Sequence, residues 1–370
     1  EMAPDDRADL VQRLDPQVQA DILPLVARAE REDIRKLVSY AEGTAGAVMS
    51  TDYAVLRPEH GINEALGLLR TQASVTETIY YVYIVDDLHR LTGFVSLKDL
   101  ILAKPTQTVA EVMHSEVLSI NVEDDQEEAA RKIEKYGLIA IPVIDSSETL
   151  VGIITHDDAM DILDKEQGED LLAFGGVSAE EEGDVTPYWQ SGFAATVKRR
   201  ISWLLMLFLA EGITGNVLRH YQWVEMKVPD LSLFIPLLIG TGGNAGSQTV
   251  STIIRGLATG EIETHEALKV LIKEVITGFI LGVMLGSAGF LYAHIIRGQS
   301  FEFCAVIGLS ILGICTWANN IGALVPIIAK SFGIDPAVVS APLISTLVDA
   351  TGLIIYYSVA IAVLLQVSTN

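Results

Sequence analysis

The chain has 370 residues, 50% of them apolar, and a formal net charge of −23 at pH 7. The charge is unevenly spread, because 34 of the 48 Asp and Glu residues precede Leu171. Such an acidic surface argues against nucleic acid and anionic lipid headgroups as partners. The composition predicts a water-exposed first half, followed from residue 201 by membrane-spanning segments.

Residues 1–46 form the first predicted part, a charged helical stretch that is too short to be a domain by itself. The sequence begins at Glu1 within a polar region, and no signal-peptide pattern is visible. We expect this stretch to be the helical remnant of an N-terminal domain whose upstream part is missing.

An internal repeat follows, in which residues 83–99 match residues 142–158. Each copy predicts a strand, a polar turn, a second strand and then a helix that begins after Ser or Thr. This pattern is similar to a tandem pair of α/β CBS domains. We place the first at residues 47–110 and the second at residues 111–164.

Both copies contain Gly, two apolar residues, a hydroxyl residue and, three positions later, Asp. The pairs are Ser96 with Asp99 and Thr155 with Asp158. In CBS domains such a pair can hold an adenosyl ligand, which makes an adenine nucleotide such as ATP a candidate cofactor. The alternative is that each hydroxyl only caps the helix that follows it.

Residues 165–200 are predicted to form an acidic connecting helix and a linker. The stretch 157–170 carries acids three to five positions apart, so like charges crowd along one helix. A bound divalent cation would relieve that repulsion. The alternative is a solvated acidic face without a ligand.

Residues 201–370 are predicted to be an all-α membrane domain of five transmembrane helices. Five stretches are long enough to cross about 30 Å of hydrocarbon: Ile201–Leu218, Leu231–Ile254, Val270–Ile296, Ala305–Ala329 and Ala337–Val367. Lys and Arg gather before the first stretch, between the second and third, and after the fourth. The positive-inside tendency therefore places the N-terminal half in the cytosol and the C-terminus outside.

The second stretch holds four glycines within residues 240–246, together with Asn244 and Gln248. Small residues let membrane helices approach closely, and amides can bond across their interface. A helix-packing seam and a backbone exposed to a water-filled cavity are both open interpretations.

Asp349 lies in an otherwise uncharged apolar stretch. An ionised side chain in hydrocarbon costs several kcal/mol, so it is expected to face a bundle interior or a water-filled path. Ala341, Ser345 and Asp349 recur every four residues and share one helix face. A twofold homodimer would bring two Asp349 carboxylates to one axis, and Mg²⁺ prefers oxygen ligands together with retained waters. The alternative is a protonated Asp349 that is hydrogen-bonded inside the bundle.

Two further polar groups fall at membrane depth, Glu211 in the first apolar stretch and Asn319–Asn320 in the fourth. We interpret them as contacts between helices rather than as ion ligands.

Taken together, the order of parts resembles the MgtE family of magnesium channels. The resemblance is carried by Pro236–Ile262, with its glycine run, and by Asp335–Ser358, with Asp349. It implies a homodimer in the plasma (inner) membrane whose pore is lined by the second and fifth spans. Asp349 falls at the family's pore carboxylate, Ser345 and Ala341 at the pore positions one and two turns earlier, and Asp335 at a further acidic position near the pore. The family often has Asn where this chain has Ala341.

The same resemblance implies a cytosolic Mg²⁺ sensor that closes the channel, and in some relatives ATP binding near Asp99. The matching sensor acids lie in the N-terminal piece, the second CBS domain and the connecting helix: Asp5, Asp9, Glu127, Asp158, Asp161, Glu166, Glu169 and Asp170. Gly137 stands where a family acid is expected, which predicts weaker or different Mg²⁺ closure.

Three other functions compete with a passive Mg²⁺ channel. An Mg²⁺ carrier coupled to Na⁺ or H⁺ would also use Asp349. An intramembrane aspartyl protease needs two convergent carboxylates and a motif that this chain lacks. A nucleotide sensor with a membrane anchor would need neither Asp349 nor the glycine run. We expect an ion channel and no enzyme.

Overall fold

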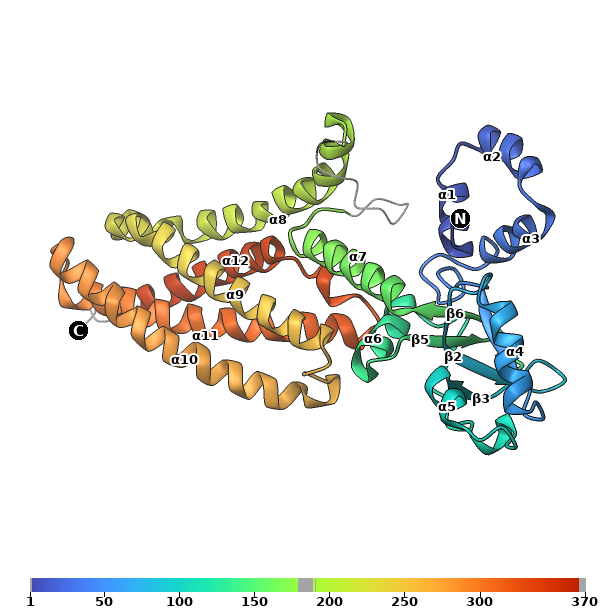
Figure 1. Ribbon diagram of the computed structural model, residues 1–370. Helices are drawn as coiled ribbons and strands as arrows, with labels where there is room; N and C mark the ends of the chain where they lie inside the picture. Colours follow the sequence, from blue (N-terminus) through green and yellow to red (C-terminus); the bar gives the residue numbers. More distant parts are fainter. Residues whose placement is uncertain (1, 179–188, 190, 366–370) are drawn as a thin grey trace. The chain divides into compact units, whose positions relative to one another are not determined.

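The computed structural model describes residues 2–178, 189 and 191–365 (Figure 1). Residues 179–188 and 190 of the predicted linker, and 366–370 at the end of the predicted fifth span, lie outside this description. The chain divides into two compact units, Glu1–Glu166 and Gln167–Asn370.

The first unit begins with three short helices: α1 (Pro4–Gln12), α2 (Pro16–Ile22) and α3 (Arg28–Leu37), with a 3-10 turn at Leu23–Leu25 between the last two. Ala8 of α1 and Leu37 of α3 are almost fully buried in one apolar cluster with residues of the second repeat copy. Helices α1 and α3 therefore share the core of that repeat.

The two repeat copies have the same α/β order. The first consists of β1 (Tyr53–Leu56), α4 (Ile62–Gln72), β2 (Thr78–Val85), β3 (Leu91–Ser96) and α5 (Leu97–Leu102). The second, after a 3-10 turn at Val109–Glu111, consists of β4 (Ile120–Asn121), α6 (Gln126–Tyr136), β5 (Ala140–Ile144), β6 (Leu150–Thr155) and α7 (His156–Phe174). In each sheet the first strand pairs parallel to the second, which pairs antiparallel to the third. The predicted α/β repeat is confirmed.

The two sheets pack on one another. Tyr83 and Val85 of β2 are buried with Ala140, Leu150 and Ile153 of the second sheet. Backbone bridges between Ser50 and Ile153 and between Arg90 and Thr149 add hydrogen bonds across the pair. The two copies therefore share a continuous core.

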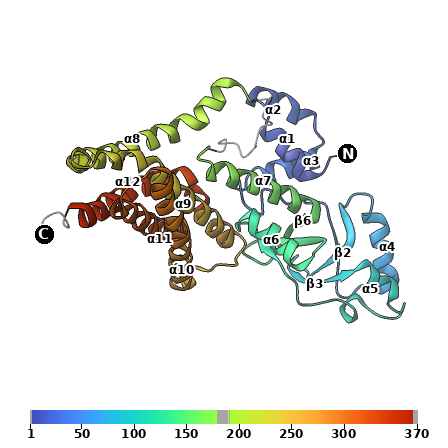
Figure 2. The ribbon, with the colours of Figure 1, turned by 90° about the vertical axis from the view of Figure 1, so that its left-hand side faces the viewer.

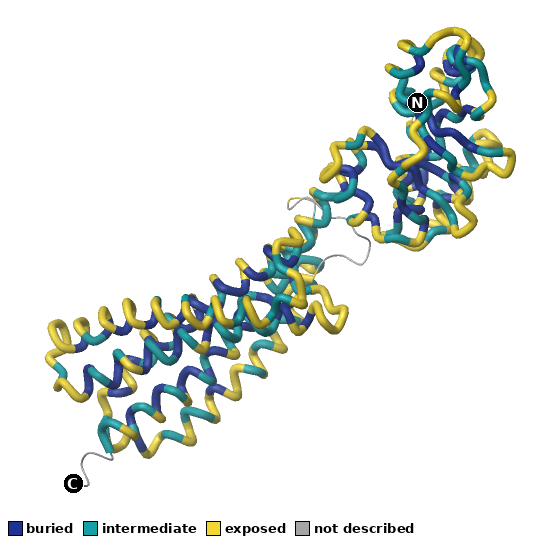
Figure 3. Tube along the Cα trace, turned by 90° about the horizontal axis from the view of Figure 1, so that it is seen from below, coloured by how far each residue is buried: buried dark blue, intermediate teal, exposed yellow. Residues whose placement is uncertain are grey.

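The second unit is all-helical, as predicted. It contains α8 (Phe193–Lys227), α9 (Ile235–Ala258), α10 (Ala267–Leu291), α11 (Phe301–Ser331) and α12 (Ala341–Ala360). Short 3-10 turns at Pro229–Phe234, Thr264–Glu266 and Pro336–Val338 and π turns at Tyr292–Ile296 and Ile361–Leu365 connect or extend them. Helix α11 packs against α9, α10 and α12, whereas α8 contacts α12 at one edge of the bundle (Figure 1, Figure 2). Buried residues gather on the inner faces (Figure 3).

Four helical segments among the described residues are long and apolar enough to cross a membrane: Phe193–Lys227, Thr264–Ile296, Phe301–Ser331 and Ala341–Leu365. The predicted second span forms the 24-residue helix α9 but is not among the four. Its Gly, Asn, Gln, Ser and Thr residues lower its hydropathy. The prediction of five spans is therefore not confirmed.

The last helix begins later than the predicted span. Asp335 accepts a hydrogen bond from Ala337 N at 2.8 Å and caps a short 3-10 turn. Ser340 then caps α12 by accepting from Leu343 N at 3.3 Å. These two caps place Ala341 as the first residue of α12.

Candidate ion pathway and acidic surfaces

Asp349 is half-buried on α12 and faces the glycine run of α9. A Cβ at Gly243 would lie 2.6 Å from Ser345 Oγ and 3.7 Å from Asp349 Oδ1. A side chain at this position would displace the Ser345 hydroxyl from its present place beside Asp349. The structure therefore brings Ser345 and Asp349 together beside a glycine backbone.

Two neighbouring glycines extend this contact, which we call the α9 seam (Gly242, Gly243 and Gly246). A Cβ at Gly242 would lie 2.6 Å from Ile314, and one at Gly246 would lie 2.9 Å from Ile344. The α9 seam therefore sets the approach of α9 to both α11 and α12.

The other predicted pore residues lie nearer the start of α12. Ala341 is its first residue, two turns before Asp349 on the same face. Asp335 is exposed before the helix and acts as a cap. Their ion-binding roles stay predictions.

Helix α9 presents an exposed polar face. Asn244, Gln248, Ser251 and Thr252 are exposed in the protomer, although they lie on a helix of a membrane bundle. Polar groups exposed to lipid are unfavourable. These side chains would be more stable in contact with water or with another protein chain.

Asp5 of α1 lies close to acidic residues of the CBS pair. Its Oδ1 is buried and has no hydrogen-bond partner among the described residues. Burial, followed by the charges of Asp158 and Glu77, raises the pKa of Asp5 to about 7. Burial also raises the pKa of Asp158, although a hydrogen bond from Thr155 opposes this shift. These carboxylates thus repel each other in a half-buried place, which a cation or a proton would stabilise.

The remaining predicted sensor acids are dispersed. Asp9 pairs with Arg13 at 3.7 Å, and Glu127 pairs with Arg131. Glu166 Oε1 accepts from Gln126 Nε2 at 2.7 Å, and Asp161 is exposed on α7. Glu169 and Asp170 lie on the same α7, which continues without a break from the second repeat. The described residues contain no group of three His, Cys, Asp or Glu side chains placed to hold a metal ion.

Both predicted nucleotide pairs form hydrogen bonds at the start of a helix, and in the first pair the Ser96 hydroxyl caps α5. Asp99 N donates to Ser96 Oγ at 3.1 Å, and Ser96 Oγ donates to Asp99 Oδ2 at 2.6 Å. The hydroxyl of Ser96 is the main cause that lowers the pKa of Asp99. His114, stacked on Phe94, approaches Asp99 Oδ2 at 3.4 Å.

In the second copy, Thr155 Oγ1 donates to Asp158, and Thr155 N donates to Asp158 Oδ2 at 3.2 Å. Both pairs therefore make hydrogen bonds within their own helix start, and nucleotide binding by them stays a prediction.

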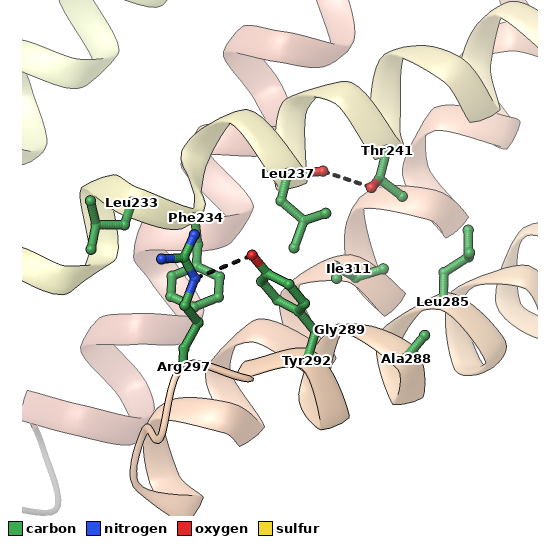
Figure 4. Close-up of a pocket in the computed structure, with 10 residues that line it drawn as sticks. All are labelled: Leu233, Phe234, Leu237, Thr241, Leu285, Ala288, Gly289, Tyr292, Arg297 and Ile311. Carbon is green, nitrogen blue, oxygen red and sulfur yellow. Dashed lines mark hydrogen bonds between the residues drawn. The ribbon is translucent and has the colours of Figure 1, made fainter. Parts of the chain in front are cut away.

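A cavity of about 300 Å³ lies between α9 and α10 (Figure 4). Its lining is mostly apolar, and Arg297 Nε donates to Tyr292 OH at its edge, at 3.2 Å. It contains none of the predicted site residues.

Sequence reasoning missed a second glycine contact, which we call the α10 seam (Gly278, Gly282 and Gly286). A Cβ at Gly282 would lie 2.8 Å from Leu312 Cα, and one at Gly286 would lie 2.5 Å from the Gly308 carbonyl oxygen. The signal was available as three glycines at four-residue spacing in one apolar stretch.

A carboxylate on a glycine-lined seam of an apolar helical bundle, in one chain with a pair of α/β repeats, fits a membrane transport protein. Comparison with known protein families supports a transport protein. Residues 235–359 match a divalent cation transporter family, MgtE. Residues 45–105 and 109–165 match CBS domains, and residues 1–43 match the MgtE intracellular N domain.

Curated relatives cover nearly the whole chain. The magnesium transporter MgtE of Thermus thermophilus is 37% identical over 96% of this chain and 78% of its own length. The magnesium transporter MgtE of Enterococcus faecalis is 34% identical over 90% of this chain and 71% of its own length. The chain belongs to the MgtE family of magnesium transporters.

A solved structure of the cytosolic domain of the Mg²⁺ channel MgtE in complex with ATP is also similar. It is 39% identical, with a TM-score of 0.43, over 44% of this chain and 66% of that chain.

Proposed function

We propose that this protein is a passive Mg²⁺ channel that works as a homodimer and uses Asp349 as its pore carboxylate. The observation that carries the proposal is the position of Asp349 and Ser345 against the backbone of Gly243. A carboxylate and a hydroxyl beside an open backbone supply oxygen ligands for an ion that keeps part of its hydration shell.

A second copy of the chain completes this path. The exposed polar face of α9 lies on the helix that also contacts Asp349. Twofold symmetry would turn two such faces toward one axis. Their amides and hydroxyls would then line water rather than lipid, with α9 as the fifth span.

Uptake of Mg²⁺ into proteoliposomes tests the channel, with no Na⁺ or H⁺ gradient imposed. We expect uptake by the wild type and its loss in Asp349→Asn, which keeps the shape but removes the charge. Size-exclusion chromatography of each variant is the control for an intact dimer. Uptake that requires an added Na⁺ or H⁺ gradient would instead identify a coupled carrier.

For regulation, we propose that Mg²⁺ closes the channel by binding acidic residues of the soluble unit, with Asp5 and Asp158 at the contact between α1 and the second CBS domain. Because the pKa of Asp5 is raised to about 7 in the docked state, docking of α1 is strongest at low pH. It weakens as pH rises from about 4, the ordinary pKa of Asp, and levels off above about 7. A divalent cation would replace the proton.

Fluorescence energy transfer between a dye on α1 and a dye on α4 measures this docking. Without Mg²⁺, we expect docking at pH 6 and partial release at pH 8, with recovery on addition of Mg²⁺. Asp5→Asn should stay docked at both pH values, because it cannot ionise. Equal release of Asp5→Asn and the wild type at pH 8 would remove Asp5 from the sensor.

For ATP, we propose that Ser96 and Asp99 contribute to an adenine-nucleotide site in the first CBS domain, and Thr155 and Asp158 to a second. The supporting feature is the polar cluster of Ser96, Asp99 and His114 beside the Phe94 ring. Calorimetric titration with ATP tests this. We expect binding that Asp99→Ala weakens, and absence of heat with the wild type would leave only the capping role.

We also propose an inner-membrane location with the N-terminal unit in the cytosol and the C-terminus outside, because Lys198, Arg199 and Arg200 flank the start of α8. Both native cysteines are fully buried on α11, so introduced cysteines can be labelled selectively. Ser232→Cys should react with an impermeant thiol reagent in intact cells, and Glu261→Cys only after permeabilisation. The reverse pattern would invert the topology.

A further inference from the structure

Glu211 is a second carboxylate in the apolar part of the bundle. It lies near the middle of the 35-residue helix α8, which is long and apolar enough to span a membrane. Its side chain is exposed in the protomer. Among the described residues, neither a hydrogen bond nor an ion pair satisfies it.

The contacts between α8 and α12 place Glu211 at the depth of Asp349. At one end, Trp203 Nε1 donates to Ser340 Oγ at 3.1 Å. At the other, the rings of Tyr221 and Tyr357 stack with centroids 4.9 Å apart. Because both helices advance between these two contacts, they run side by side in the same direction.

The helical rise then gives the depth of each carboxylate. At 1.5 Å per residue, Glu211 lies about 12 Å beyond Trp203, and Asp349 lies about 13 Å beyond Ser340. The two carboxylates are therefore level along the bundle. They lie on two helices that pack against each other.

Two like charges at one depth of a membrane are more costly than one. A salt bridge to a basic residue would lower that cost, but Glu211 has none in the part of the chain that is described. Thr214, one turn further along α8, adds a hydroxyl Oγ1 that is buried and lacks a hydrogen-bond partner among the same residues. These oxygens carry the charge and chemistry that a divalent cation would neutralise.

We propose that Glu211 acts with Asp349 on the same hydrated divalent cation, and that it sets the affinity and charge selectivity of the ion path. This inference rests on the proposed passage of Mg²⁺ at Asp349 and assigns to Glu211 a role beyond a contact between helices. Asp349 holds the ion beside Ser345 and Gly243. Glu211 contributes a second negative charge from α8, toward the waters that Mg²⁺ retains.

The test compares Glu211→Gln, Glu211→Asp and the wild type in the Mg²⁺ uptake assay, over a range of Mg²⁺ concentrations. We expect Glu211→Gln to raise the half-saturating Mg²⁺ concentration about tenfold, equivalent to about 1.4 kcal/mol. Glu211→Asp keeps the charge and should stay within about threefold of the wild type. Asn216→Ala, an exposed polar position on the same helix, is the matched control and should behave as the wild type.

Block by hexaamminecobalt(III), an inert mimic of hydrated Mg²⁺ with a higher charge, provides a readout that a structural role would not move. We expect Glu211→Gln to weaken this block by a larger factor than it weakens Mg²⁺, because three charges are attracted instead of two. Equal impairment of Glu211→Asp and Glu211→Gln would show that side-chain shape matters rather than charge, and would overturn the inference.

The role of Glu211 and the ion path at Asp349 are tested by different outcomes. If Asp349→Asn abolishes uptake while Glu211→Gln keeps the wild-type concentration dependence, only the role of Glu211 is wrong. If Asp349→Asn leaves uptake unchanged, the proposed path itself is wrong. If Glu211→Gln fails to form the dimer, block by hexaamminecobalt(III) is compared between Glu211→Asp and the wild type. Both carry a negative charge at this position, so unequal block would overturn the inference.

Discussion

The α9 seam and the α10 seam are both built from glycine, but they meet different partners. At the α10 seam, the atoms that a Cβ would strike at Gly282 and Gly286 belong to the backbone of α11. At Gly243 of the α9 seam, the atom that a Cβ would strike is the side-chain oxygen of Ser345, and Asp349 Oδ1 lies in ordinary contact at 3.7 Å. Glycine therefore holds helices together at the α10 seam and leaves room for polar side chains at Gly243.

The largest effect on folding is expected from Gly286→Ala. The added methyl group would lie 2.5 Å from the Gly308 carbonyl oxygen, and a backbone atom in a packed helix cannot rotate away. Overpacking of this kind costs about 1–3 kcal/mol. We expect a lower thermal unfolding temperature and uptake that falls in proportion to the remaining folded protein. An unchanged unfolding temperature would contradict a rigid α10 seam.

A smaller effect on folding but a specific effect on uptake is expected from Gly243→Ala. The added methyl group would strike Ser345 Oγ at 2.6 Å, and that hydroxyl can rotate to another rotamer. The helix should therefore remain packed, while the oxygens at Asp349 are displaced. We expect an unfolding temperature close to that of the wild type and severalfold slower Mg²⁺ uptake per folded protein. Joint loss of stability and uptake would make the two seams equivalent.

Much of this architecture could be predicted from the sequence because it rests on local patterns. The repeat of Gly93 and Gly152 with their flanking strands predicted two α/β copies, and both form. The spacing of Ser345 and Asp349 predicted one helix face, and the helix α12 is continuous there. Such features depend on residues that are near each other in the chain.

Contacts between segments that are distant in the chain could not be predicted from the sequence. Nothing in the sequence sets the register of α8 against α12; that register follows from the contacts of Trp203 and Tyr221. Asp5 and Asp158 are separated by most of the soluble unit, and only the packing of α1 brings their charges together. Helix α9 forms where a span was predicted but is not among the helices apolar enough to cross a membrane, because its Gly, Asn, Gln, Ser and Thr residues lower its hydropathy.

The smallest effect, and the only stabilising one, is expected from Gly67→Ala in α4, outside both seams. A Cβ there meets no atom within 4 Å, and the position is exposed in a helix interior. Replacing Gly with Ala in such a place favours the helix by about 0.5–1 kcal/mol. Chemical denaturation of the soluble unit within the whole protein should show this gain, while Mg²⁺ uptake stays at the wild-type rate. The same methyl group is added at all three sites, and we expect its effect to depend on the atoms around each glycine. A loss of stability in Gly67→Ala, where no atom is near, would contradict that explanation.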